Sequence, residues 1–214
     1  KEGVLFFRPE FTKVGAGLWQ ELRIPDHETL GDGPKSLSRK ESFDYDFAGT
    51  TLEVVGEPGL AVLGSALDED GWAVRVRCDV PDRPAELRVR VRAEGGEVRY
   101  EDAFDLSCRA PTRMEISKPE VPQRCAVGAR VLVAHSIFDA SGVRLSGHGV
   151  AVQDPESAAL AIDPGQPDTA GSQLWLAAVR PGAAATLRAG AIGAAIPVEV
   201  VTADVLGETA CRDR

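Results

Sequence analysis

Four cysteines are the residues of this chain whose chemistry constrains it most. Cys78, Cys108, Cys125 and Cys211 are spaced 30, 17 and 86 residues apart. None of them has the Cys-x-x-Cys spacing of a zinc or redox site. An even number, with two before residue 110 and two after it, favours two disulfides and therefore an oxidising compartment. The alternative is a cytosolic protein with four buried free thiols.

Five arginines are candidates for binding an anion. They alternate with apolar residues in two expected strands, so each set points to one face of its strand. If the two strands are neighbours, the guanidinium groups form a basic patch that suits a carboxylated polysaccharide or a lipid phosphate. The alternative is a solvated face neutralised by nearby glutamates. The five residues are Arg75, Arg77, Arg88, Arg90 and Arg92.

The other titratable residues do not form a catalytic or metal-binding set. His27, His135 and His148 are isolated, and we expect His135 to be an ordinary strand residue that faces solvent. His27 lies among acidic residues, so a zinc or calcium site is the alternative there to a solvated loop. The segment 68–71 has too few spaced carboxylates for a calcium loop and predicts a hairpin turn, with Gly71 at positive φ.

No Gly-x-Ser-x-Gly elbow and no signature of a nucleophilic cysteine occur in the chain. The sequence therefore predicts a protein that is not an enzyme, with no catalytic residues, no bound metal and no cofactor.

Composition narrows the class of partner. A net charge of −9 and a pI near 4.9 argue against nucleic acid. No apolar run approaches the roughly 20 residues of a membrane helix, and we expect any signal peptide to have been removed or never present. Asparagine is absent and arginine far outnumbers lysine, which is typical of a GC-rich bacterial genome.

Short segments recur along the chain at similar offsets. Arg8-Pro9-Glu10 returns as Lys118-Pro119-Glu120, Val14-Gly15-Ala16 as Val127-Gly128-Ala129, and the segment 85–88 as 185–188, at offsets of 110, 113 and 100. Together they indicate two copies of a unit of about 100 residues, a common size for a β-sandwich. We expect domains at 1–110 and 111–214, joined at the short segment 109–112.

Alternating apolar and polar residues predict strands in both units. Gly95 and Gly96 indicate a two-residue type I′ hairpin turn, with Leu87 opposite Phe104, Val91 opposite Tyr100 and Arg90 opposite Glu101. The other strands expected in the first unit are 4–7, 18–24, 41–47, 51–55, 61–67 and 72–78, with a long loop at Pro25–Lys40. Those expected in the second unit are 113–118, 129–138, 149–153, 158–162, 173–179, 184–189 and 196–202, with a turn at 139–142 and a loop at Asp163–Ser172. Trp19, Trp72 and Trp175 are expected in the core.

Residues 111–205 resemble a bacterial immunoglobulin-like domain of the invasin and intimin type. The resemblance rests on Met114-Glu115-Ile116, Val127-Gly128 before Val131-Leu132-Val133, and the turn Phe138-Asp139-Ala140-Ser141-Gly142. It continues through Val150-Ala151-Val152, Asp154-Pro155-Glu156-Ser157-Ala158, Val179-Arg180-Pro181-Gly182 and Val198-Glu199-Val200. The tryptophan common in the family's third strand is absent, and the first unit resembles the family only through its similarity to the second.

The resemblance implies an all-β chain of two tandem immunoglobulin-like β-sandwiches, the first divergent. In this topology the first and last strands run parallel, which implies the disulfides Cys78–Cys108 and Cys125–Cys211; the alternative is Cys108–Cys125 across the junction.

The resemblance also implies a structural or adhesive module, binding a protein or glycan, at the surface of a high-GC Gram-negative bacterium. Such a module is monomeric or weakly oligomeric, has no membrane span of its own, and can belong to a lipoprotein or a larger surface protein. The alternatives are an accessory domain pair of a secreted hydrolase and a self-assembling surface-fibre subunit.

Overall fold

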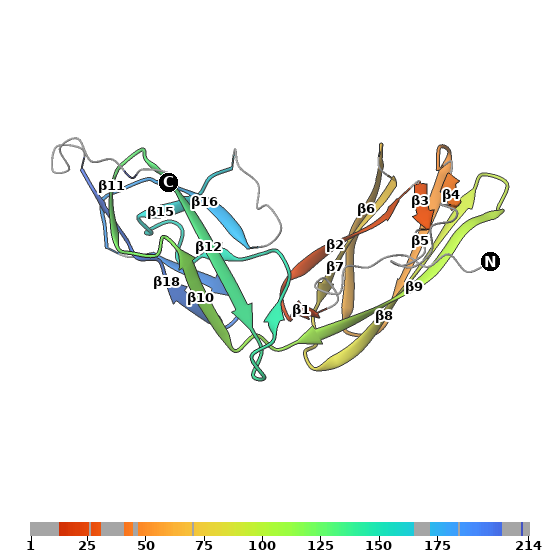
Figure 1. The fold of residues 1–214 in the computed structure, drawn as a ribbon, viewed down its shortest axis with the longest axis horizontal. Coiled ribbons are helices and arrows are strands. Elements are labelled where there is room, and N and C mark those ends of the chain that lie inside the picture. Colours follow the sequence, from red (N-terminus) through yellow and green to blue (C-terminus); the bar gives the residue numbers. More distant parts are fainter. Residues whose placement is uncertain are drawn as a thin grey trace.

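The chain is built from β-strands. The computed structural model describes residues 13–25, 27–30, 41–44, 47–69, 71–164, 172–183, 185–202 and 211. In this part of the chain every regular element is a β-strand. The strands form two β-sandwiches that meet at an angle (Figure 1). None of the described residues forms a helix long and apolar enough to cross a membrane.

Nine strands of the first sandwich lie within the described residues. They are β1 (Lys13–Gly15), β2 (Trp19–Pro25), β3 (His27–Leu30), β4 (Glu41–Asp44), β5 (Thr50–Gly56), β6 (Leu60–Asp68), β7 (Gly71–Cys78), β8 (Arg83–Ala93) and β9 (Val98–Arg109). One sheet has the order β1-β9-β8-β5 and the other the order β2-β7-β6. β1 runs parallel to β9, while the other pairs are antiparallel, which is an immunoglobulin-like arrangement.

The second sandwich has the same kind of layering. Its strands are β10 (Arg113–Lys118), β11 (Gln123–Ala126), β12 (Arg130–Phe138), β13 (Arg144–Leu145), β14 (Ala151–Val152), β15 (Leu160–Ile162), β16 (Gln173–Ala178), β17 (Thr186–Ala189), β18 (Ile192–Ala195) and β19 (Val198–Val201). The orders are β10-β12-β16-β15, with β13 beside β12, and β14-β17-β18. β11 pairs in parallel with β19, the last described strand.

The hairpin of β8 and β9 has the register that the sequence predicts. Leu87 lies opposite Phe104, Val91 opposite Tyr100 and Arg90 opposite Glu101. The turn itself differs from the prediction, because only Gly96 has positive φ, at 82°. Four residues separate the two strands, and a register shift between Val91 and Arg92 gives the predicted pairing in the rest of the hairpin.

The prediction of a loop at Pro25–Lys40 is wrong for residues 27–30. His27–Leu30 forms β3 and pairs antiparallel with β4. Backbone hydrogen bonds hold this pair, and its sequence lacks the apolar alternation from which a strand is predicted. Residues 31–40 and the predicted strand 4–7 lie outside the described residues, as does most of the loop at Asp163–Ser172.

One disulfide joins the ends of two strands, and the other joins a strand to Cys211. Cys78 ends β7 and Cys108 lies near the end of β9, so their bond ties the two sheets of the first sandwich together, with Cα atoms 5.6 Å apart. Cys125 on β11 is bonded to Cys211, with Cα atoms 5.0 Å apart. This is the pairing that the family resemblance implies.

Each sandwich has the same hydrogen-bonded turn after a strand that pairs in parallel, β1 in the first sandwich and β11 in the second. Four bonds correspond in order, with N···O distances of 2.7–3.3 Å. In the first sandwich they are Ala16 N to Arg109 O, Gly17 N to Cys78 O, Leu18 N to Gly15 O and Cys78 N to Leu18 O; in the second they are Val127 N to Val201 O, Gly128 N to Ala178 O, Ala129 N to Ala126 O and Ala178 N to Ala129 O.

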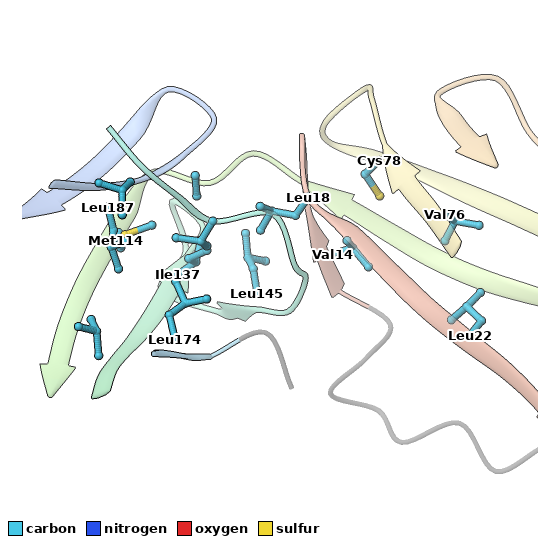
Figure 2. Close-up of a cluster of buried hydrophobic side chains, with 14 of the residues drawn as sticks. Val14, Leu18, Leu22, Val76, Cys78, Met114, Ile137, Leu145, Leu174 and Leu187 are labelled. Atoms are coloured by element: carbon cyan, nitrogen blue, oxygen red, sulfur yellow. The ribbon is translucent and has the colours of Figure 1, made fainter. Parts of the chain in front are cut away.

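The hydrophobic core continues from one sandwich into the other. Val14 and Leu18 of the first lie near Leu145 and Ile137 of the second (Figure 2), and all four are at most 5% exposed. The core therefore does not stop at the segment that joins the two sandwiches.

The prediction of core tryptophans needs correction. All three are half-buried, and only Trp72 packs against the core cluster. Trp175 alternates with the buried Leu174 and Leu176, so its side chain is on the outer face of its sheet.

Candidate functional site

The five arginines do not form one patch. Arg88, Arg90 and Arg92 lie on β8, whereas Arg75 and Arg77 lie on β7, in the other sheet. Because the outer faces of two packed sheets point in opposite directions, the two sets are on opposite sides of the sandwich. Apolar alternation correctly predicted that these arginines lie on the outer faces of their strands. Alternation does not indicate which sheet a strand joins.

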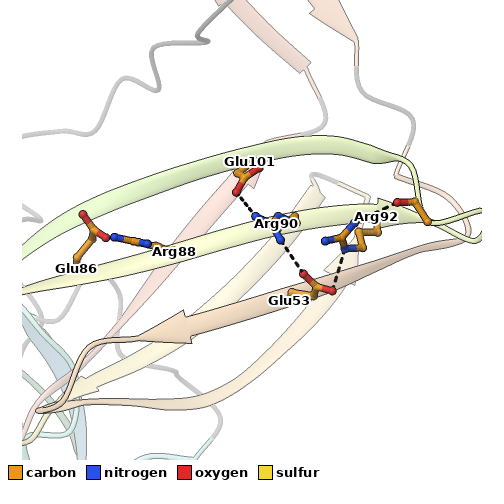
Figure 3. A network of polar contacts seen from close by, with 7 residues as sticks. Glu53, Glu86, Arg88, Arg90, Arg92 and Glu101 are labelled. Atoms are coloured by element: carbon orange, nitrogen blue, oxygen red, sulfur yellow. Dashed lines mark hydrogen bonds and ion pairs between the residues drawn. The ribbon is translucent and has the colours of Figure 1, made fainter.

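Arg90 and Arg92 of β8 belong to a charged ladder (Figure 3). Glu53, Arg90 and Glu101 stand opposite one another across β5, β8 and β9. Arg90 pairs with Glu101 and lies 3.7 Å from a Glu53 carboxylate oxygen. Arg92 Nε donates to Glu53 at 2.9 Å. We call these four residues the ladder.

The ladder neutralises its own charges. The hydrogen bond from Arg90 lowers the pKa of Glu101, so this carboxylate remains ionised opposite the guanidinium. Arg88 pairs in the same way with Glu86 on its own strand. An external anion must therefore compete with a carboxylate at each of these arginines, and anion binding stays a prediction. The ion pairs are exposed, so each contributes little to stability.

The arginines of β7 also have carboxylate partners. Arg75 Nε donates to Glu21 at 3.0 Å, and its guanidinium lies over the Trp19 ring, 5.3 Å from the centroid. Arg77 Nε donates to Asp79 at 2.6 Å, and this bond lowers the pKa of Asp79. Arg75 therefore contacts Trp19, which lies where the two sandwiches meet.

The junction between the sandwiches is held by backbone hydrogen bonds. Gly15 N donates to Ser146 O at 3.1 Å, and Ser146 N donates to Lys13 O at 2.9 Å. Trp19 and His148 exchange two further bonds, at 3.1 and 2.7 Å. Two short β-bridges, one parallel and one antiparallel, therefore connect the segments 13–19 and 145–149.

Side chains fill the space between these bridges. The rings of Trp19 and His148 are stacked, with centroids 4.3 Å apart. Leu18 is fully buried, and a Cβ on Gly147 would lie 2.7 Å from Leu18 Cβ. Gly147 also has φ of 134°, so glycine is required there for both reasons. Sequence reasoning missed this junction, because no motif links residues so far apart.

The histidines differ from the prediction in one case. His135 is 2% exposed and shares the inward face of β12 with Val131, Val133 and Ile137, so the expectation that it faces solvent is wrong. His148 belongs to the junction. His27 lies on β3, and its side chain lies outside the described part of the chain.

The acidic segment 68–71 is a hairpin turn, as predicted. β6 ends at Asp68 and β7 begins at Gly71, whose φ is 112°. Asp68 accepts from Arg23 at 2.9 Å. Among the described residues, no group of three or more histidine, cysteine, aspartate or glutamate side chains is placed to hold a metal ion.

Asp139 is a buried carboxylate that organises the turn at 139–142. It accepts hydrogen bonds from Ser141 Oγ at 2.8 Å, Ser141 N at 2.9 Å and Val143 N at 2.9 Å. These bonds, with that of the Ser141 side chain foremost, lower the pKa of Asp139. Gly142 completes the turn with φ of 79°.

We expect Asp139→Asn to destabilise the protein most at neutral pH. A carboxylate with a depressed folded pKa contributes stability above its unfolded pKa of about 3.9, and this contribution is lost as the pH falls through the folded value. Urea unfolding of both proteins between about pH 7 and pH 3 measures the difference. It should shrink towards acid pH, and a difference that does not change with pH would contradict the assignment.

Comparison with protein-family models and with curated proteins finds no match. Among solved structures, domains 4 and 5 of the S-layer protein SbsC are 17% identical, with 73% of this chain and 72% of that chain covered and a TM-score of 0.32. Dpr2 Ig1-Ig2, in complex with DIP-Theta Ig1-Ig3, is 13% identical over 92% and 97%, with a TM-score of 0.33. The D00-D0 domain of intimin is 9% identical over 87% and 92%, with a TM-score of 0.29.

Proposed function

We propose that this chain is an exported, non-catalytic module that holds binding surfaces in a fixed geometry at a bacterial cell surface. Residues 1–110 and 111–214 are its two domains, of the invasin and intimin type, and the first is the divergent copy. The observation that carries the proposal is the junction, where four backbone hydrogen bonds and a continuous core connect the sandwiches. A module that spaces or presents a binding site needs such a fixed orientation.

Two further observations support the proposal. The matching turns after β1 and β11 favour duplication of one unit, because the same four bonds recur in the same order. The two disulfides, with no free cysteine, favour an oxidising compartment outside the cytosol. We also propose that the chain comes from a GC-rich Gram-negative bacterium. It would belong there to a lipoprotein or to a larger surface protein.

The partner that we propose is a protein or a glycan. Sandwich modules bind through end loops or sheet edges. The segments to investigate first are Pro25–Lys40, which includes β3, and Asp163–Ser172, because segments that connect the strands of a rigid scaffold commonly carry binding residues.

The fixed geometry can be tested by residual dipolar couplings in a weakly aligned solution. If the junction holds, couplings from both sandwiches fit one alignment tensor. Two tensors of different magnitude would show independent motion and would sink the proposal of a rigid spacer.

Export is tested separately, by peptide mapping of the native protein without reduction. Linked peptides that contain Cys78 with Cys108 and Cys125 with Cys211 are the expected result. Four free thiols in freshly isolated protein would instead indicate a reducing compartment.

A further inference from the structure

Among the described strands, β6 is an outer strand of its sheet. It pairs with β7 along its length, and no described strand pairs with its other side. Its residues from Leu60 to Leu67 carry no charge. An open, uncharged strand offers unpaired backbone N–H and C=O groups to another strand.

Apolar side chains are exposed along this strand. Val62, Leu63 and Leu67 are 41%, 47% and 39% exposed. The register with β7 shifts between Val62 and Gly64, which leaves Leu63 without a partner on that strand. Val62 and Leu67 lie opposite Val76 and Trp72, so they extend the inner face of the sheet beyond the covered core.

Other outer strands of the first sandwich carry charges that discourage pairing. β2 has Glu21 and Arg23, and β5 has Glu53 in the ladder. Such charges are a common protection of sheet edges. On β6 itself the nearest charge is Asp68, which is already paired with Arg23 of the same copy. On β7, Arg77 and Arg75 lie opposite Ala61 and Gly64, and each is paired with a carboxylate of the same copy.

We propose that two copies of the chain associate through β6, antiparallel about a two-fold axis near Ser65. Each chain carries a net charge of −9, so two copies repel over most of their surfaces and can approach most easily where charge is absent. With the axis at Ser65, residues 63–67 lie opposite the same uncharged residues of the other copy and Asp68 lies opposite Val62, so no like charges stand opposite one another. Because both copies use the same strand, the contact closes as a dimer and does not extend into a fibre.

The test is the mass of the full chain in solution as a function of concentration, by sedimentation. From about 1 µM to about 1 mM, the average mass should rise from 22.7 kDa towards twice that value. Ser65→Lys and Ser65→Asp should each weaken association at least about tenfold, because the new charge meets its own copy across the axis. An equimolar mixture of the two variants should associate again.

Thr51→Lys and Thr51→Asp are the matched controls, because Thr51 is an exposed, uncharged residue on β5, the outer strand of the other sheet. They should leave association unchanged, alone or mixed. Circular dichroism and thermal unfolding confirm that each variant is folded. A chain that remains monomeric at about 1 mM, or a dimer that the Ser65 variants do not weaken, overturns the proposal. The test needs no ligand and does not depend on the proposed function.

Discussion

Replacing Cys78 and Cys108 together by alanine is expected to lower the free energy of unfolding by about 3–4 kcal/mol. The disulfide closes a loop of 30 residues and so restricts the unfolded chain. Both cysteines are 1% exposed, and Cys78 also exchanges backbone hydrogen bonds with Gly17 and Leu18 at the junction. Urea unfolding under non-reducing conditions measures the loss.

The double variant Cys125→Ala and Cys211→Ala is the control for this result. It removes the other disulfide, which closes 86 residues and involves no residue of the junction bridges. We expect a loss of similar size, about 4 kcal/mol. Only the Cys78 and Cys108 variant should also disturb the amide resonances of residues 15–19. A loss below about 1 kcal/mol for that variant would show that packing alone holds its two sheets together.

Leu18→Ala is expected to cost about 3 kcal/mol of stability and to loosen the junction. Leu18 is fully buried between the two sandwiches, against Gly15, Gly147 and Gly149. The three glycines have no side chain that could move into the cavity left by the leucine, so the packing contacts of Leu18 are lost without replacement. Urea unfolding measures the stability, and residual dipolar couplings measure the orientation of the sandwiches.

Leu22→Ala is the matched control. Leu22 is the same residue type, 3% exposed, but it is on β2 within the first sandwich. The two variants should lose comparable stability, whereas only Leu18→Ala should separate the alignment tensors of the sandwiches. If both variants keep one tensor, the hydrogen-bonded bridges fix the orientation without Leu18.

The sequence predicted the elements that have strong local patterns. The register of β8 and β9 followed from apolar alternation on both sides of Gly95 and Gly96. Strands β11, β13 and β18 have two to four residues, too few to show alternation, and none was predicted. The disulfide pairing was accessible only through a family resemblance, because four cysteines alone allow three pairings.

The site was less predictable than the fold. Alternation placed Arg75 and Arg90 on outer faces but gave no information on which sheet each strand joins. The junction depends on a contact between Trp19 and His148, which are separated by most of the chain and share no motif. Interfaces of this kind form from shape and backbone geometry after the strands have assembled, so they leave no periodic signal in the sequence.

The bond between Cys125 and Cys211 has a mechanical consequence. If the two ends of the chain are pulled apart, tension passes directly from one sulfur to the other, and the residues between them carry no load. The Cys78–Cys108 bond shields a shorter stretch in the same manner. While the Cys125–Cys211 bond is intact, the residues that it encloses, which are most of the second sandwich, cannot be extended by force, so this part of the surface keeps its shape.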